Sequence, residues 1–398
     1  MNLDASQLAA VSNATSSRVS IITGGAGTGK TTIIKAITNQ LESSNETVTL
    51  CAFAGKAAAR LREATQHPAS TIHRLLQYNG KQFLAASLSD QSIIIDESSM
   101  IDSMLLAEII MRKPKRLCLV GDQAQLAPVG RGAPFHDLLT LKPLLVSNLT
   151  TCYRATEAVF KAATDIRSGG RPPMQSQSAN EKWTMRNTGS PENTQAQIIA
   201  WINAGMFDFS QDVILCARNG KTSDEACTIK GLNAAIVDAI SPRDERTKWV
   251  IGDRVINTKN QPDLDVWNGT TGTIHAIDQD NSIWVKTDIP VIDWNKTKDE
   301  KDAVYTNHVL FGKDEKKHLD LAYALTVHKS QGSSYRRVLV ACFNRDAYSM
   351  LDRSLLYTAI TRTRASCCVV GEISSAWAAI DKVNHKNTVM QKLGEGES

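Results

Sequence analysis

Several classes of protein are excluded by what this sequence lacks. No apolar run reaches the ~20 residues that a membrane-spanning helix needs, so we expect no membrane helix and no membrane partner. The N-terminal segment is polar and mixed, which argues against a secretory signal peptide. The eight cysteines include no Cys-x-x-Cys pair, so a zinc site is not expected. Because several cysteines lie inside apolar runs, we expect reduced, buried thiols in a cytoplasmic protein.

A large excess of one charge is also absent. The 45 Lys and Arg residues and the 41 Asp and Glu residues give a formal net charge of +4. This value is compatible with a polyanionic partner but does not establish one. Hydrophobic residues make up 42% and charged residues 22% of the chain, as in ordinary globular proteins. A length of 398 residues suggests two or three domains with large cores.

The most informative segment that is present is a glycine-rich turn between a strand-like run, 19–22, and a helical pattern. Gly24, Gly29, Lys30 and Thr31 satisfy the P-loop spacing. Glycines allow backbone N–H groups to point inward at phosphate oxygens, and the helix that follows adds the positive end of its dipole. The pattern predicts an ATP site formed by Gly25, Ala26, Gly27, Thr28, Gly29, Lys30, Thr31 and Thr32.

Two carboxylates, Asp96 and Glu97, directly follow a second apolar run, 92–95. A P-loop ATPase needs one acid that holds Mg²⁺ and another residue that orients and deprotonates the attacking water. We assign these roles to Asp96 and Glu97. Lys30 is expected to reach the β- and γ-phosphates, and the Thr31 hydroxyl to bind Mg²⁺. The alternative interpretation of an isolated acid pair is a helix cap.

Gln125 follows the next apolar run, 116–120, and could hydrogen-bond the γ-phosphate or the lytic water. A simple polar turn is the alternative. Together with 19–22, 48–52 and 92–95, this run alternates with helical patterns, which is typical of parallel α/β units. Ligands of such sheets bind at the carboxyl ends of the strands, so we expect these segments to converge on one crevice.

The second half of the chain has a more mixed organisation. Residues 168–194 are rich in Gly, Pro, Ser and Asn and are predicted to form a linker or a long surface loop. A second α/β domain is predicted from the strand-like runs 212–217, 322–326, 337–342 and 367–370. Residues 249–312 alternate over shorter runs and are predicted to form a small inserted β-barrel. We expect its core to contain Trp249, Trp267, Trp284 and Trp294, with base stacking as the alternative.

The order and spacing of the motifs resemble those of superfamily 1 helicases. The motifs are G-G-A-G-T-G-K-T-T, I-I-D-E-S-S-M, V-G-D-Q-A-Q-L-A-P-V-G, C-Y-R, L-T-V-H-K-S-Q-G and Y-T-A-I-T-R-T-R. The later motifs are similar to those of the 5′→3′ branch, which is typified by RecD and the phage Dda helicase. The resemblance covers the chain from Gln7 to Arg364.

The resemblance implies an α/β protein with two RecA-like P-loop domains, each a parallel sheet flanked by helices, and an SH3-like β-barrel inserted in the second. On this basis we expect the first domain at 1–150, the second at 151–248 and 313–398, and the barrel at 249–312. The resemblance also implies ATP and Mg²⁺ as cofactors, with ATP between the two domains and single-stranded DNA across them.

Further roles follow only from the resemblance. Gln7 resembles the adenine-reading glutamine of the family. Arg154 and Arg362 resemble the two arginines of the second domain, where a guanidinium group stabilises the negative charge of phosphoryl transfer. Gly332 lies in a nucleotide-contacting segment. The family often carries Glu where Ser334 stands, so we expect weaker ribose binding without loss of catalysis.

Three segments resemble the strand-binding motifs of the family. Hydroxyl groups, histidines and backbone N–H groups suit the positioning of phosphates without sequence readout. The candidate DNA-binding residues are Phe53, Lys56, Thr71, His73, Thr326, His328 and Lys329. The family commonly has Pro-Thr where Phe53 and Ala54 stand, so one phosphate contact is in doubt. Phe53 is expected either to stack on a base or to pack inward.

Residues 71–91 fill the position at which relatives carry a small β-hairpin, the pin that splits the duplex. This segment is short here, and Tyr78 and Phe83 are the candidate wedge residues. An ordinary connecting loop is the alternative.

The resemblance therefore predicts a monomeric ATP hydrolase that acts as a 5′→3′ DNA helicase on single strands and on junctions of single- and double-stranded DNA. Replication or recombination proteins are candidate partners, and the cytoplasm of a bacterial or phage-infected cell is the expected location. An RNA-remodelling helicase of the same superfamily and a non-unwinding translocase that displaces proteins remain open as alternatives.

Overall fold

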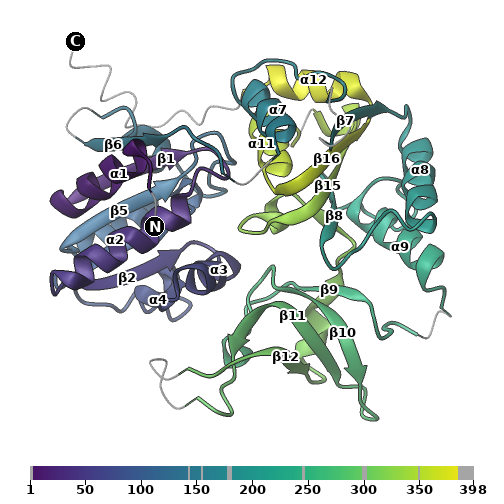
Figure 1. Ribbon diagram of the computed structural model, residues 1–398. Coiled ribbons are helices and arrows are strands. Elements are labelled where there is room, and N and C mark those ends of the chain that lie inside the picture. Colours follow the sequence, from purple (N-terminus) through teal and green to yellow (C-terminus); the bar gives the residue numbers. More distant parts are fainter. Residues whose placement is uncertain are drawn as a thin grey trace. The chain divides into compact units, whose positions relative to one another are not determined.

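The computed structural model describes residues 3–141, 144–153, 156–176, 182–243, 247–297, 303–347 and 350–383. The chain divides into two compact units, whose described parts lie within 3–153 and 156–383. Each unit is built on its own parallel sheet, and the second unit also contains an antiparallel sheet (Figure 1). Within the described ranges, every helix is too short or too polar to cross a lipid bilayer.

The first unit contains a six-stranded parallel sheet in the order β3-β2-β4-β5-β1-β6. Its strands are β1 (Val19–Gly24), β2 (Thr47–Ala52), β3 (Ala69–Thr71), β4 (Gln91–Asp96), β5 (Arg116–Gly121) and β6 (Leu145–Leu149). Its helices are α1 (Ala5–Ser16), α2 (Lys30–Ser43), α3 (Gly55–Thr65), α4 (Ile72–Leu75), α5 (Ser103–Met111) and α6 (Pro134–Leu138).

Both faces of this sheet are covered by helices. Ile22 of β1 packs in a cluster with residues of α1, α2 and α3, whereas its neighbour Ile21 packs with residues of α4, α5 and α6. On β4, Ile94 packs in the same cluster as Ile22, whereas Ile93 and Ile95 pack in the same cluster as Ile21. Successive side chains of a strand point to opposite faces, so two covered faces require the continuous apolar runs that the sequence contains.

A half-buried carboxylate connects the amino ends of three strands of the first unit. Glu46, directly before β2, accepts hydrogen bonds from Ser92 of β4 at 2.6 Å and from Arg116 of β5 at 3.1 Å. Lys115 Nζ lies 3.3 Å from its other carboxylate oxygen. Although burial opposes the shift, these hydrogen bonds to Ser92, Arg116 and Lys115 lower the pKa of Glu46 from 4.5 to about 2.

We expect the Glu46→Gln variant to be less stable than the parent by about 1–2 kcal/mol at pH 7, because it loses charge-assisted hydrogen bonds. A folded-state pKa below the unfolded value contributes stability that is present above about pH 4.5 and is lost as the pH falls toward 2. The difference between parent and variant, measured by thermal denaturation, should therefore shrink between pH 5 and pH 3. Glu63→Gln on α3 is the control, since Glu63 is exposed. If the difference in stability between the parent and Glu46→Gln were the same at pH 5 and at pH 3, this role of Glu46 would be contradicted.

The second unit contains a five-stranded parallel sheet in the order β14-β8-β15-β16-β7. Its strands are β7 (Lys182–Asn187), β8 (Asp212–Cys216), β14 (Ala324–Thr326), β15 (Tyr335–Cys342) and β16 (Thr363–Gly371). Its helices are α7 (Glu157–Arg167), α8 (Pro191–Asn203), α9 (Ile229–Ile240), α10 (Asn344–Ala347), α11 (Arg353–Ile360) and α12 (Ile373–Asp381). Residues of α8 and α9 pack on Ile214 and Leu339 of the sheet, and Figure 1 shows α7, α11 and α12 on the other side.

An antiparallel sheet lies in the chain between α9 and β14, with the order β12-β11-β10-β9-β13. Its strands are β9 (Arg254–Asn257), β10 (Thr271–Ile277), β11 (Ile283–Ile292), β12 (Tyr305–Phe311) and β13 (Leu319–Leu321). Arg254 donates two hydrogen bonds, at 2.8 and 2.7 Å, to the carboxylate of Asp288. Asn233 of α9 donates to the carbonyls of Leu321 and Ala324 at 3.2 Å, which fixes this sheet against the parallel one.

Two sequence-based expectations about the second unit were wrong. Residues 168–194 are not only a linker, because β7 lies inside this range and pairs with β16, and Trp183 is 1% exposed. The alternation of this strand is too short to stand out among the polar residues that flank it.

The second expectation was that the tryptophans of the inserted segment fill its core. Aliphatic residues and Phe311 fill its core, whereas Trp267 and Trp284 are only half-buried. Trp267 Nε1 donates to Asp265 and Trp284 Nε1 to Asp278. An indole N–H that needs a polar partner keeps the ring at the edge of a small core.

Candidate nucleotide-binding site

The glycine-rich turn joins β1 to α2 at the carboxyl edge of the first sheet. Gly27 and Gly29 have φ angles of 79° and 83°, a left-handed conformation that L residues with a Cβ rarely adopt. Gly24 is restricted by packing instead, because a Cβ there would lie 2.7 Å from Thr28 Oγ1 and 2.8 Å from Leu149 Cβ. The spacing of the glycines is therefore required by the backbone of the turn itself.

The side chains of the turn hold it in a closed curve. Lys30 Nζ donates to the carbonyls of Gly24 and Gly25 at 2.8 and 2.9 Å. Thr28 Oγ1, which is buried, also donates to the Gly25 carbonyl at 2.9 Å. The ammonium group thus lies over the turn at the start of α2, where the helix dipole is positive. A polyphosphate bound there would meet the ammonium group and the inward-pointing N–H groups together.

The acidic pair lies at the same edge of the sheet. Asp96 is the last residue of β4, and β5 stands between β4 and β1 in the sheet. Asp96 Oδ1 accepts the backbone N–H of Glu97 at 2.9 Å. Glu97 has a φ angle of 52°, a left-handed conformation that costs a non-glycine residue about 1 kcal/mol or more. Such strain at the end of a strand is typical of functional positions.

Gln125 follows β5 at this edge and is buried. Its Nε2 donates to Asp122 Oδ2 at 3.4 Å, while Asp122 Oδ1 accepts the N–H of Ala124 at 3.1 Å. The buried Asp122 therefore shapes the turn that carries Gln125. Because β4, β5 and β1 are neighbours and run parallel, the predicted residues of this unit are brought to one edge.

The oxygen donors at this edge fit Mg²⁺. This ion usually binds one or two protein ligands together with waters and substrate phosphates. Thr31 in the first turn of α2 offers a hydroxyl, and Asp96 offers a carboxylate. Among the described residues, no group of three or more His, Cys, Asp or Glu side chains could hold a metal ion. A hydroxyl and a carboxylate are donors that suit an ion whose other ligands come from a nucleotide and water.

Gln7, the predicted adenine-reading residue, is buried against the glycine-rich turn. Its Nε2 donates to the Thr28 carbonyl at 3.3 Å, and a Cβ on Gly29 would lie 2.6 Å from that nitrogen. Its Oε1 accepts the N–H of Asp4, and the Asp4 side chain accepts the N–H of Gln7. This reciprocal capping box fixes the start of α1 and orients the Gln7 amide.

Tyr153 is a residue of this site that the sequence analysis did not name. Its N–H donates to the Gly27 carbonyl at 2.8 Å, and its hydroxyl donates to Asp4 Oδ2 at 2.6 Å. The hydrogen bonds from Ser6 and then from Tyr153 hold the pKa of Asp4 below its usual value. The ring remains 59% exposed beside the turn. In the sequence, the only indication of a role for Tyr153 was its position directly before Arg154 in the Cys-Tyr-Arg motif.

The candidate DNA residues of the first unit lie at or just after the ends of the neighbouring strands β2 and β3: Phe53 follows β2, Lys56 lies in α3, Thr71 ends β3 and His73 lies in α4. Ala52 of β2 is paired with Asp96 on one side and with Thr71 on the other. Thr71 caps α4 by accepting the N–H of Arg74, and it is buried, as is Lys56. The candidate strand-binding and nucleotide-binding segments are therefore adjacent along this edge.

An aromatic cluster surrounds His73. Phe53, Tyr78 and Phe83 lie 6.2, 5.6 and 5.9 Å from its ring, measured between centroids. Burial lowers the pKa of His73, which the Asp102 carboxylate partly opposes. Phe53 is half-buried in this cluster and packs on the core below, which agrees with the inward-packing alternative.

The predicted pin region contains a short hairpin. An isolated antiparallel bridge pairs Tyr78 with Phe83, and their rings lie 4.7 Å apart. Tyr78 is 43% exposed, whereas Phe83 packs on the core. Arg112, after α5, donates to the carbonyls of Phe83 and Ala85 at 2.9 and 2.7 Å and fixes the returning arm. The sequence analysis did not identify this anchoring arginine.

The remaining predicted residues belong to the second unit, except Arg154, which lies outside the described residues. Thr326 ends β14, and its Oγ1 accepts the N–H of Lys329 at 3.2 Å. Burial lowers the pKa of His328, and the Asp352 carboxylate opposes this. Gly332 has a φ angle of 70°. Arg362 is buried between α11 and β16, and its Nε donates to the Thr358 carbonyl at 3.1 Å.

Comparisons with known families agree with these motifs. The family described as an AAA domain matches residues 2–186, and the UvrD-like helicase C-terminal domain matches residues 321–370. The chain is 31% identical over 387 residues to the ATP-dependent RecD2 DNA helicase of Deinococcus radiodurans, covering 94% of this chain and 50% of that protein. It is 28% identical over 436 residues to the RecBCD enzyme subunit RecD of Mycolicibacterium smegmatis, covering 97% of this chain and 74% of that protein. The chain thus spans about half the length of the first relative.

The fold agrees with a solved structure. The Pif1 helicase from Bacteroides, in complex with ADP-AlF3 and single-stranded DNA, matches 100% of this chain and 98% of its own, with a TM-score of 0.60 and 17% sequence identity. At this identity the match concerns the fold alone.

A glycine-rich turn at the carboxyl edge of a parallel sheet, with an acid pair and a glutamine after the neighbouring strands, is the arrangement typical of the α/β class of P-loop nucleoside triphosphatases. The chain contains two parallel sheets, and it matches an AAA domain and a UvrD-like helicase C-terminal domain. Within this class, these features are similar to those of helicases. The chain is similar to the RecD2 and RecD proteins, and its motifs resemble those of the 5′→3′ branch of the superfamily 1 helicases.

Proposed function

We propose that this protein is an ATP-dependent DNA helicase that translocates 5′→3′ on single-stranded DNA and unwinds duplexes. The observation that carries the proposal is the shared edge of the first sheet. There β1 and β4 present the nucleotide-binding residues, and β4, β2 and β3 continue directly to the strand-binding segments. A conformational change at the bound nucleotide would therefore reach a bound DNA strand through adjacent β-strands of one sheet.

The chain's residues divide the ATPase chemistry among them. ATP supplies the phosphoanhydride bond whose cleavage drives movement. Lys30 neutralises phosphate charge, and Thr31 and Asp96 hold Mg²⁺. Glu97 accepts the proton of the attacking water, and Gln125 orients it. The resemblance to the family assigns Arg154 and Arg362 to the charge that develops on the transferred phosphoryl group.

The strand-binding residues favour contacts with phosphates over base readout. His73 and His328 have lowered pKa values and are therefore neutral at physiological pH, so they contribute hydrogen bonds and ring surface rather than charge. Thr71 and Thr326 are already held by local hydrogen bonds at the ends of their strands. Such groups position a backbone without reading its sequence, as a translocase requires.

The finer architecture is also part of the proposal. We take the antiparallel sheet to be the SH3-like barrel expected from the resemblance, and the domain limits to be 1–150, 151–248 with 313–398, and 249–312. Strand β13 lies beyond residue 312 and pairs with β9, which supports an upper limit of the barrel nearer to residue 321. A monomer is the proposed working form, and single-stranded DNA and its junctions with duplex are the proposed substrates.

Polarity and unwinding are tested together with oligonucleotide duplexes that carry either a 5′ or a 3′ single-stranded tail. We expect strand separation of the 5′-tailed duplex with ATP and Mg²⁺, and none of the 3′-tailed duplex or without ATP. Strand release is followed by native gel electrophoresis, and ATP hydrolysis should be stimulated by single-stranded DNA. Preferential unwinding of the 3′-tailed duplex would contradict the proposal.

The short hairpin favours a second candidate, a translocase that moves on single strands and displaces proteins without splitting duplexes. A single bridge, Tyr78 with Phe83, gives only a small wedge. Displacement of a protein block from a single strand, without separation of a 5′-tailed duplex, would identify this activity. An RNA-remodelling enzyme of the same fold would be stimulated more by an RNA oligomer than by the matched DNA oligomer.

A further inference from the structure

A cavity of ≈ 470 Å³ lies in the second unit, lined by strands β7, β15 and β16 and by the end of α8 with the residues that follow it. This volume is in the range of ligand-binding pockets. Most of its wall is apolar, with Trp201, Phe207 and Leu339 among the residues that form it. Basic side chains, those of Lys182, Arg186 and Arg337, also line it.

The basic residues are placed on one face of the sheet by strand register. Ser366 of β16 pairs with Lys182 of β7 on one side and with Arg337 of β15 on the other. Arg186 lies on the same face of β7, about 13 Å further along the strand. The cations thus border the cavity from β7 and β15, the two strands on either side of β16.

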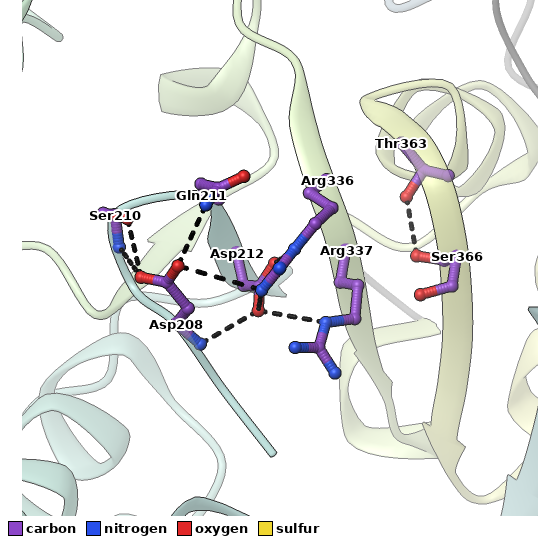
Figure 2. A network of polar contacts seen from close by, with 8 residues as sticks. All are labelled: Asp208, Ser210, Gln211, Asp212, Arg336, Arg337, Thr363 and Ser366. Carbon is purple, nitrogen blue, oxygen red and sulfur yellow. Dashed lines mark hydrogen bonds and ion pairs between the residues drawn. The ribbon is translucent and has the colours of Figure 1, made fainter. Parts of the chain in front are cut away.

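Two of these cations have no carboxylate partner among the described residues, and the third, Arg337, shares one with Arg336. Figure 2 shows that Arg337 shares Asp212 with Arg336, at 3.1 and 3.0 Å, and that the far end of the Arg337 guanidinium points away from this carboxylate. Among the described residues, neither Lys182 nor Arg186 forms an ion pair with a carboxylate. The pocket therefore carries a positive charge that a bound anion would balance.

The chemistry of the wall distinguishes between polyanions. Single-stranded nucleic acid binds to exposed aromatic faces, on which its bases stack. Here the Arg186 guanidinium already lies over the Trp201 ring, 5.5 Å from the centroid. The other aromatic ring of the lining, Phe207, is stacked on Phe209 with 5.7 Å between the centroids and packs against the core. The rest of the apolar lining is aliphatic or sulfur-containing, as Met206 and Leu339 illustrate. This surface suits an apolar side chain better than a nucleobase.

We propose that this pocket binds an acidic peptide segment of a partner protein, which places one apolar side chain in the cavity and its carboxylates on Lys182, Arg186 and Arg337. The site lies apart from the strand-binding candidates of the same unit. Lys182 begins β7 and Arg337 lies near the start of β15, whereas Thr326 ends β14. Arg186 is level with Thr326 in the register, but β7 and β14 are the two outer strands of the sheet, with β16, β15 and β8 between them. The peptide and the DNA would therefore contact different sides of the sheet.

The test measures fluorescence anisotropy of a fluorescein-labelled octapeptide made of Asp and Glu residues followed by Leu-Phe. The Lys182→Glu/Arg186→Glu double variant should bind it roughly tenfold more weakly than the parent, since exposed attractions become repulsions. Lys161→Glu, an exposed lysine of α7, is the matched control and should bind as the parent does. Replacing Leu-Phe by Ser-Ser in the peptide should also weaken binding by roughly tenfold or more.

Equal binding by the parent and the double variant, or equal binding of the two peptides, would overturn the proposal. ATP hydrolysis stimulated by single-stranded DNA should be unchanged in the double variant, which shows that it is folded. If the double variant instead loses binding of a labelled oligothymidylate and keeps that of the peptide, the pocket is a nucleic-acid site and the proposal is wrong.

Discussion

The Lys30→Ala variant is expected to hydrolyse ATP about a thousandfold more slowly than the parent, because it loses a positive charge aimed at the phosphates. In the structure Lys30 Nζ donates to the carbonyls of Gly24 and Gly25, so the ammonium group is held over the turn before any ligand arrives. A charge that is positioned in advance costs no reorganisation during the reaction, which makes its loss severe. Steady-state phosphate release with saturating single-stranded DNA measures the effect.

The control for this variant is Lys35→Ala, which removes a half-buried lysine from the next turn of α2. It should hydrolyse ATP at nearly the rate of the parent. Both variants should unfold within a few degrees of the parent, because the hydrogen bonds of Lys30 join only backbone groups of one turn. If the Lys30→Ala variant still hydrolysed ATP at a substantial rate, the P-loop would not be the site of ATP hydrolysis, and the proposed function would be contradicted.

The Arg362→Ala variant is expected to lower ATP turnover by a factor of about 10³–10⁵ while nucleotide binding changes little. A guanidinium group that acts on phosphoryl transfer stabilises charge present only in the transition state, so its loss lowers kcat rather than affinity. Single-turnover hydrolysis and the binding of a fluorescent ATP analogue, measured separately, resolve the two effects.

A structural role for Arg362 must be distinguished from a catalytic one. Its Nε donates to the Thr358 carbonyl at the end of α11, and its carbonyl accepts the N–H of Tyr335. Thermal denaturation therefore accompanies the kinetics. Arg364→Ala is the matched control, since Arg364 is exposed only two residues further on. Arg362→Lys should remain strongly impaired, because an ammonium group does not reproduce the planar fork. A loss of turnover that merely follows a loss of folded protein would contradict the catalytic role.

The strands of the first unit that the sequence predicted best are those with two covered faces. The predicted runs 19–22, 48–52, 92–95 and 116–120 correspond to β1, β2, β4 and β5, each extended by one or two residues. Strand β6 was missed because it has one neighbour in the sheet, and its exposed residues interrupt the apolar pattern. The short strand β3 was missed because its three residues give no periodic signal.

In the candidate site, the sequence identified the residues of contiguous motifs, but it did not identify residues whose contacts are with distant parts of the chain. The glycine-rich turn and the acid pair are contiguous in sequence, and the geometry of a tight turn demands particular residues at particular positions. Tyr153 and Arg112 were not identified, because their roles depend on partners far away in the chain. Asp4 bonds Tyr153 across 149 positions, and Phe83 bonds Arg112 across 29.

The amino-acid sequence by itself determined the α/β class of this protein, its glycine-rich turn and the order of its motifs, because these depend on local backbone geometry and on residue types at fixed spacing. Only the tertiary structure decided which surfaces those elements form together. The alignment of β2, β3 and β4, the half-buried tryptophans of the antiparallel sheet and the basic pocket beside Arg186 all arise from strand register and packing. Register brings together residues that no sequence spacing relates, since strand pairing is set by the whole core and not by the neighbours of each residue.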